Sequence, residues 1–181
     1  MYADGVLLSS LPLTRFAIRP ATLGDAAAIA RVQTDSWQSS YRGILPDAIL
    51  ATMDPVRRTP MRREILRDPA ALNLVAYDTT FGDVVGFANA GPARDAPPTT
   101  GELFEIYIVE HAKRFGLGRE LLDTVTDWCR AQRMTSLVIW VLDQNQHARR
   151  FYEAMGGRLS ASKSSMVRGH AVLERSYVWS L

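Results

Sequence analysis

The sequence predicts one α/β domain of the α+β kind, built on a mixed and mostly antiparallel sheet of six to seven strands with helices on both faces. Two observations support this fold class. The 181 residues are 47% hydrophobic and 22% charged, a composition typical of a globular protein with one core. Segments with the periods of strands and helices follow the order β-α-α-α-β-β-β-α-β-α-β-β. An antiparallel meander, a strand–helix–strand crossover and a final hairpin form such a sheet.

The strands are predicted from short runs rich in β-branched and aromatic residues. Their expected positions are residues 16–19, 73–77, 83–89, 103–109, 136–142 and 173–179. The run at 136–142 is almost continuously apolar, which is typical of a strand buried on both faces. The polar segment 160–169 is instead expected to be a long connection within the last hairpin.

The helices are predicted from apolar residues at helical spacing and from signals at their ends. They are expected to begin near residues 22, 46, 54, 117 and 145. Thr22 and Asp25 have the spacing of a capping box, and Asn145 is the expected N-cap of the last helix. Gly156 and Gly157 end that helix. The domain is expected to span residues 14–181, after an irregular leader at 1–13.

Composition and charge exclude several classes of function. The net charge of +2 is too small to indicate nucleic acid or a membrane surface. Cys129 is the only cysteine, which excludes an intrachain disulfide, and it is expected in the core. The histidines lack ligand spacing, so no metal site is predicted. No run reaches transmembrane length and no signal peptide precedes the domain, so the expected location is cytoplasmic. The arginines of the third helix are expected on a solvated face, with attraction of an acidic acceptor as the alternative: Arg57, Arg58, Arg62 and Arg63.

The segment from Gly101 to Arg133 is where the sequence indicates a ligand. A short apolar strand leads into a basic loop with Gly116 and Gly118, and a helix follows. Unpaired N–H groups and the positive end of a helix dipole meet at such a point, which binds phosphate. The loop is not a P-loop, because its glycines are too close together. It is not a dinucleotide fingerprint either, because Leu121 stands where the third glycine would be.

This loop is similar to the pyrophosphate loop of the GCN5-related N-acetyltransferase (GNAT) family, Q/R-x-x-G-x-G/A, with Lys113 in the first position. The segment from Asn145 to Gly156 resembles the family's motif N-x-x-A-x-x-F-Y-E-x-x-G at every fixed position. The amino-terminal segment with Trp37 and Tyr41 resembles family members that act on small amines. The three matches extend along nearly the whole chain, which is identified on them as a small-molecule type member of the family.

The resemblance implies that acetyl-CoA is the co-substrate. In this family the strand before the loop and the strand after the helix splay apart, and the pantetheine inserts between them like an added strand. The N–H groups of residues 114–119 would then hold the diphosphate, with basic side chains of the loop on the 3′-phosphate. The expected cofactor-binding residues are Ile106, Tyr107, Ile108, Val109, Lys113, Arg114, Phe115, Gly116, Leu117, Gly118, Arg119, Asn145, Ala148 and Tyr152.

The reaction implied is direct attack of a primary amine of a small molecule on the thioester, in a ternary complex. Such attack needs a neutral amine, an acceptor for one proton and a donor to the leaving thiolate. Tyr152 is the expected general acid, because the equivalent tyrosine of the family lies near the sulfur of CoA. Glu102 is the leading general base, expected to act through a water molecule, and Glu105, on the opposite face of the strand by alternation, is the rival. No base is needed if the amine arrives deprotonated.

The acceptor pocket is expected to include Trp37, Tyr41 and Glu105 and to be bordered by residues 160–170. The motifs do not define the acceptor amine or the preferred acyl chain. Two other functions share them: a module that binds or senses acyl-CoA without turnover, and a protein N-terminal or lysine acetyltransferase. The intact acid and base favour the enzyme over the module. Dimerisation is common in the family, and the last strand with Trp179 is the candidate contact.

Overall fold

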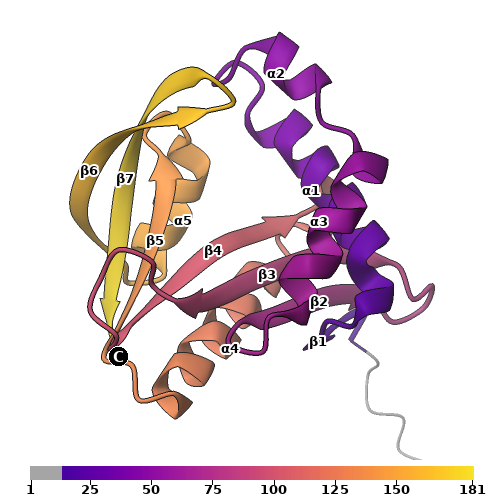
Figure 1. Ribbon diagram of the computed structural model, residues 1–181. Coiled ribbons are helices and arrows are strands. Elements are labelled where there is room, and N and C mark those ends of the chain that lie inside the picture. Colours follow the sequence, from indigo (N-terminus) through magenta and orange to yellow (C-terminus); the bar gives the residue numbers. More distant parts are fainter. Residues whose placement is uncertain (1–13) are drawn as a thin grey trace, which may run out of the picture.

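The computed structural model describes residues 14–181, so the expected leader at 1–13 lies outside the described residues. It forms one seven-stranded mixed sheet with helices on both faces (Figure 1), which confirms the predicted fold class. The strand order is β1-β2-β3-β4-β5-β7-β6, in which β4 and β5 are parallel and the other neighbours antiparallel. The strands are β1 (Phe16–Pro20), β2 (Leu72–Asp78), β3 (Val84–Pro92), β4 (Thr100–Ile108), β5 (Ser136–Leu142), β6 (Arg158–Val167) and β7 (His170–Ser180). The α-helices are α1 (Ala26–Ser40), α2 (Asp47–Ala51), α3 (Pro55–Arg67), α4 (Leu117–Ala131) and α5 (Gln146–Ala154).

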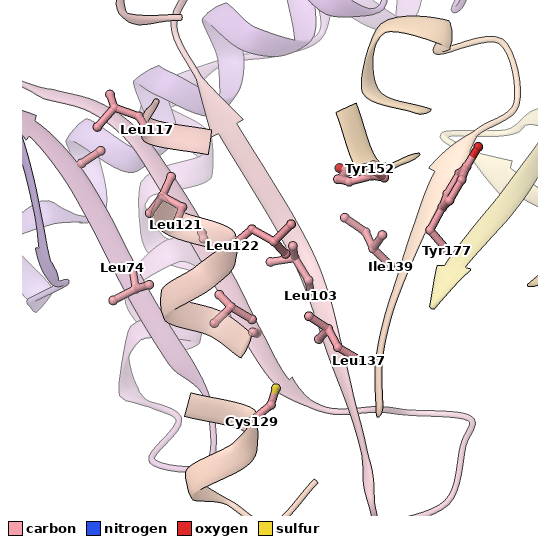
Figure 2. Packing of buried hydrophobic residues seen from close by; sticks show 14 of the residues in the cluster. Leu74, Leu103, Leu117, Leu121, Leu122, Cys129, Leu137, Ile139, Tyr152 and Tyr177 are labelled. Atoms are coloured by element: carbon pink, nitrogen blue, oxygen red, sulfur yellow. The ribbon is translucent and has the colours of Figure 1, made fainter. Parts of the chain in front are cut away.

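Each face of the sheet is covered by helices that carry an apolar stripe. α4 packs Leu121, Val125 and Cys129 on one face, all of them fully buried (Figure 2 labels Leu121 and Cys129). This confirms the prediction that Cys129 belongs to the core. α1 packs Ile29 and Val32 on the other face. Burying a side chain of this size stabilises the fold by about 1.5–3 kcal/mol, so these two layers hold the sheet in place.

The two helix starts that the sequence specified are confirmed. Thr22 and Asp25 form a capping box, in which the Thr22 N–H donates to Asp25 Oδ2 at 2.7 Å. Arg19 donates to both oxygens of the same carboxylate at 2.8 Å, and these hydrogen bonds lower the pKa of Asp25 to about 2. At the start of α5, Asn145 accepts a hydrogen bond from the Ala148 N–H at 3.1 Å.

The prediction of a long connection at 160–169 was wrong. Residues Arg158–Val167 form strand β6, which is joined to β7 by a two-residue turn. Arg168 and Gly169 both have positive φ, at 49° and 83°, which suits a tight hairpin. The strand was missed because β6 lies at the edge of the sheet and is largely exposed, so its polar sequence shows no burial pattern.

The sheet is open between β4 and β5. These strands pair only from Thr100–Ser136 to Glu102–Val138 and then diverge toward their carboxyl ends, as Figure 1 shows. β4 continues to pair with β3, and β5 with β7. The gap therefore lies inside the sheet, and the expected splayed central pair is confirmed.

A β-bulge in β4 lies beside this gap. Asn89 of β3 pairs with Glu105, whereas Gly91, two residues further along β3, pairs with Glu102, three residues back along β4. Phe104 is the extra residue. Asn89 and Gly91 are two residues apart on β3, so they face the same side of the sheet. Paired residues face the same side as well, so Glu102 and Glu105 share one face. The prediction that they lie on opposite faces was wrong, because strict alternation fails across a bulge.

Candidate active site

A cleft of about 990 Å³ opens where β4 and β5 diverge. One wall is β4 with the loop before α4, and the other is β5 with the start of α5; α1 and the β6–β7 hairpin border its far end. This volume suits a cofactor arm together with a small substrate. The expected site residues that line the cleft are Trp37, Tyr41, Glu105, Ile106, Tyr107, Ile108, Lys113, Arg114, Gly116, Gly118, Arg119, Asn145, Ala148 and Tyr152.

Three residues expected in the cofactor site have side chains that do not line the cleft. The Phe115 ring packs edge-on against Phe16 at 5.1 Å between centroids, and Leu117 is buried in the core. Val109 also packs against the core, and its N–H donates to the Val85 carbonyl at 2.9 Å. Phe115 and Leu117 can therefore reach a ligand in the cleft only with their backbone N–H groups. Val109 can reach it with neither its side chain nor its N–H group.

The backbone of β4 presents hydrogen-bonding groups to the gap. The N–H of Val109 points toward β3, and backbone groups alternate in direction along a strand. The N–H and C=O groups of Ile106 and Ile108 consequently point away from β3, toward the space that β5 has left. An extended chain in the gap can pair with them as a further strand.

The loop before α4 presents a row of free N–H groups. The groups on either side of this row are occupied: Lys113 N–H donates to Glu110 O at 3.2 Å, and Glu120 N–H to Gly116 O at 3.1 Å. Between them, the N–H groups of residues 114–119 donate to no protein acceptor in the described chain. Gly116 has a φ of 86°, a conformation that favours glycine. Six free donors at the amino terminus of a fifteen-residue helix form an arrangement that can bind a phosphate.

Basic side chains surround this row. Arg114 and Arg119 are exposed at the cleft, and Lys113 pairs with Glu110 at 2.7 Å. Arg150 of α5 also lines the cleft from the opposite wall. Sequence reasoning missed Arg150 because the family motif leaves that position variable.

Tyr152 is buried between the two diverging strands, beside Ile139 (Figure 2). Its ring lies 5.9 Å from Tyr177 and 6.1 Å from Trp179, which pack behind it. Burial raises the pKa of Tyr152, and no protein group in the described chain forms a hydrogen bond with its hydroxyl. A neutral phenol with a free proton therefore faces the cleft. Trp179, the candidate dimer contact, packs against the core and donates to the Met155 carbonyl at 2.9 Å, so it is not a free surface.

Glu102 lies at the closed end of the gap. The residue is 6% exposed, and its Oε1 accepts a hydrogen bond from Arg94 Nη2 at 2.6 Å. The Arg94 guanidinium also covers the Phe104 ring, 4.7 Å from its centroid. Glu102 is not among the residues that line the cleft, so the leading base lies apart from the residues expected at the acceptor.

Glu105, the rival base, lines the cleft and is held from behind by two helices. Its Oε1 accepts hydrogen bonds from Gln33 Nε2 and Arg62 Nη2, both at 2.7 Å, and Arg62 Nη1 binds Oε2. Arg58 fixes Gln33 in turn, with 2.6 Å from its Nε to Gln33 Oε1. Arg62 is only 2% exposed, so the prediction that it lies on a solvated face was wrong. Its carboxylate partner comes from a distant strand and is not visible in the helix sequence.

Three aromatic side chains form a hydrogen-bonded cluster where the cleft meets α1, the end at which the acceptor was expected and which is called here the acceptor end. Trp37 Nε1 donates to the Tyr107 hydroxyl at 3.0 Å, and the hydroxyls of Tyr41 and Tyr107 are 3.2 Å apart. Burial raises the pKa of both tyrosines, so both are neutral. The side chain of Tyr107, expected beside the cofactor, thus lies with Trp37 and Tyr41, the residues expected at the acceptor.

Comparison of the sequence with models of protein families gives a match that agrees with these structural features: the opened strand pair, the free N–H row and the tyrosine between the strands. The model of the acetyltransferase (GNAT) family matches residues 33–157, more than half of the chain. The chain belongs to the GNAT family. It is an acyltransferase, an acetyl-CoA-dependent N-acetyltransferase.

Known GNAT proteins resemble the chain over nearly its whole length. It is 30% identical over 164 residues to YuaI of Bacillus subtilis (strain 168), described as an uncharacterized N-acetyltransferase, which covers 90% of this chain and 91% of YuaI. PaiA N-acetyltransferase from Thermoplasma acidophilum, solved with coenzyme A, is 16% identical with a TM-score of 0.71 over 88% of this chain and 97% of PaiA. YncA from Salmonella typhimurium, solved with acetyl-CoA, is 22% identical with a TM-score of 0.67 over 92% and 94%.

Within residues 14–181, no helix is long and apolar enough to cross a membrane. The same part of the chain contains no group of three His, Cys, Asp or Glu side chains that could hold a metal ion.

Proposed function

We propose that this enzyme acetylates the primary amine of a small molecule by direct attack on acetyl-CoA in a ternary complex. The observation that supports a small acceptor is a set of contacts between the β6–β7 hairpin and the segment after α1, which cover the acceptor end of the cleft. Leu45, after α1, and Leu142 of β5 are buried there, and Val167 of the β6–β7 hairpin packs against them. Arg168 at the hairpin tip donates to Thr52 Oγ1, just after α2, at 3.2 Å. Figure 1 shows this tip beside α2. A polypeptide acceptor would have to displace this contact.

The residues around the gap fit acetyl-CoA. The free N–H groups of residues 114–119 would hold the diphosphate, and the backbone groups of Ile106 and Ile108 would pair with the pantetheine. Arg114 and Arg119 would bind the 3′-phosphate, because both are exposed beside the N–H row. When bound, acetyl-CoA supplies an acetyl group that is already activated as a thioester.

Tyr152 would donate the proton that the leaving thiolate needs. In the reaction the C–N bond to the amine forms and the C–S bond breaks, while the nitrogen loses one proton and the sulfur accepts one. Burial raises the pKa of Tyr152, which keeps the phenol protonated, and no other acceptor in the described chain competes for its hydrogen. The proton is therefore present and free at this point, although the raised pKa lowers the driving force for its transfer to the thiolate.

Glu105 is the better candidate for the group that receives the amine. It lines the cleft, whereas Glu102 does not. Arg62 and Gln33 bind it from behind and leave part of its carboxylate, with 20% of the side chain exposed, open to the cleft. An incoming ammonium can donate to this carboxylate and pass one proton to it, directly or through a water molecule.

Thiol release from acetyl-CoA, measured with small primary amines and with peptides, tests the proposal. We expect turnover with small amines and none with a peptide that presents a free N-terminal alanine or a lysine. Turnover of the peptides alone would overturn the small-molecule proposal. Acetyl-CoA binding by calorimetry without turnover of either class would favour a binding module. Thermal-shift screening of amines in the presence of CoA then narrows the acceptor, since a ligand of the native state raises the melting temperature.

A further inference from the structure

Lys163 of β6 places its ammonium group against two residues of the acceptor end of the cleft. Its Nζ lies 4.0 Å from the centroid of the Trp140 ring and 3.9 Å from Glu174 Oε2. Trp140 of β5 and Glu174 of β7 line the cleft, and Lys163 does not. A cation is therefore held between an aromatic face and a carboxylate, the combination that recognises organic cations. The protein itself supplies that cation.

Lys163 is held loosely in this position. Its side chain is 44% exposed, and 3.9 Å is the outer limit of an ion pair. No hydrogen bond of the Lys163 side chain is formed within residues 14–181. Such exposed pairs contribute little to stability, so another cation can replace this ammonium at small cost. The Trp140 ring and the Glu174 carboxylate, which is 20% exposed, remain as the fixed part of the site.

The two carboxylates of the acceptor end differ in how their charge is balanced. Glu105 is bound by Arg62, a guanidinium buried at 2% exposure that cannot leave without unfolding the helix contact. Within residues 14–181, Glu174 forms an ion pair with no cation other than the exchangeable ammonium of Lys163. Glu105 lies on β4 and Glu174 on β7, which is joined to the other wall through β5. One carboxylate can thus serve the reacting amine while the second, across the gap, is free to bind another positive charge.

We propose that Trp140 and Glu174 form a subsite for a second cationic group of the acceptor. The preferred substrate class is then a diamine, in which one amine is acetylated beside Glu105 and the other replaces the Lys163 ammonium on Trp140. This inference rests on the proposed function, because the subsite lies in the same cleft. The alkyl chain between the two amines would lie along the aromatic side chains of the pocket, which favour an apolar linker.

Matched pairs of substrates test the subsite. Diamines of four to eight carbons are compared with the monoamines of the same length, for example 1,4-diaminobutane with butylamine. We expect kcat/KM for the best diamine to exceed that of its monoamine by about tenfold or more. Glu174→Gln should lower the value for the diamine about tenfold and that for the monoamine far less, so that the ratio approaches one. Lys163→Met should raise the value for the diamine severalfold, because the competing ammonium is gone. Glu64→Gln, a change at an exposed carboxylate on α3, is the control and should leave the ratio as it is.

The outcomes separate the two proposals. Turnover of both series without a preference for diamines, or a preference that Glu174→Gln does not reduce, overturns the subsite and leaves the proposed function standing. If peptides are turned over and neither the diamines nor the monoamines are, both the proposed function and the subsite are overturned. Where nothing is turned over, the melting temperature with CoA decides: a larger increase with 1,4-diaminobutane than with butylamine, lost in Glu174→Gln, supports the subsite, and equal increases overturn it.

Discussion

Replacement of Arg62 by methionine tests the ion pair that holds Glu105. Methionine keeps a long apolar stem, so the contact with Phe87, whose ring centroid lies 5.0 Å from the guanidinium carbon, is largely retained. The carboxylate of Glu105 loses its cation and two charge-assisted hydrogen bonds. It keeps the hydrogen bond from Gln33. The change therefore isolates the charge of Arg62 from its packing.

The expected loss of stability is about 3 kcal/mol. Removing one partner of a buried pair costs about 3–5 kcal/mol, because the other charge is left without compensation. Hydrogen bonds to charged groups contribute about 1.5–3 kcal/mol each, which gives the same order. The side chain of Glu105 is 20% exposed at the cleft, so water can partly rehydrate the carboxylate. The lower end of the range is therefore expected.

Urea unfolding at pH 7, followed by circular dichroism, measures this loss. Arg63→Met is the matched control: Arg63 is the exposed neighbour on the same helix, and its change should stay within about 0.5 kcal/mol. The double variant Arg62→Met, Glu105→Gln should recover at least half of the loss, because no buried charge remains. A loss below about 1 kcal/mol for Arg62→Met, or no recovery in the double variant, would refute the reasoning.

Three further predictions concern the acid, a buried carboxylate and a tightly packed glycine. Tyr152→Phe should leave acetyl-CoA affinity unchanged by calorimetry and lower kcat by about 10²-fold or more; unchanged turnover would remove Tyr152 from the mechanism. Because its pKa is raised, Tyr152 stays protonated and should add no basic limb to kcat below about pH 10. The pKa of Asp25 falls from 3.8 to about 2, so its contribution to stability is complete above about pH 4 and is lost toward pH 2. Because solvent screens its partly exposed partner Arg19, the expected loss is about 1–2 kcal/mol. Acid titration should show this loss in the wild type and not in Asp25→Asn. Gly101→Ala would place a Cβ 2.6 Å from Cys129 Sγ and 2.9 Å from Met134 Sδ, and should cost about 1–3 kcal/mol in urea unfolding.

The sequence was sufficient for the features that single residues encode locally. The left-handed φ at Gly116 requires glycine, and the N-cap of α5 requires a side chain such as Asn145, so the loop and helix start could be placed. The apolar stripe of α4 showed which face packs on the sheet. Each of these depends on neighbours within a few residues along the chain.

The features that failed depend on partners far away in the sequence. Arg62 is buried because a strand some forty residues later supplies Glu105, and no pattern within α3 contains that information. The bulge at Phe104 reverses the alternation of β4, so Glu102 and Glu105 could not be assigned to faces from spacing alone. The polar strand β6 is stabilised by pairing with β7 rather than by burial, which leaves no hydrophobic period to detect.

The short stretch of pairing between β4 and β5, called here the seam, is the only backbone pairing that joins the two halves of the described sheet. Three residue pairs join a four-strand half, β1 to β4, to a three-strand half, β5 to β7, and beyond the seam the halves touch through the core side chains beneath α4 and α5 and, at the far end of the cleft, through the contacts of Leu45 with Leu142 and Val167. An extended ligand paired with the free edge of β4 would contact both halves and hold them together. Amide hydrogens on both flanks of the seam should then exchange more slowly in the complex than in the empty protein, including some that never contact the ligand.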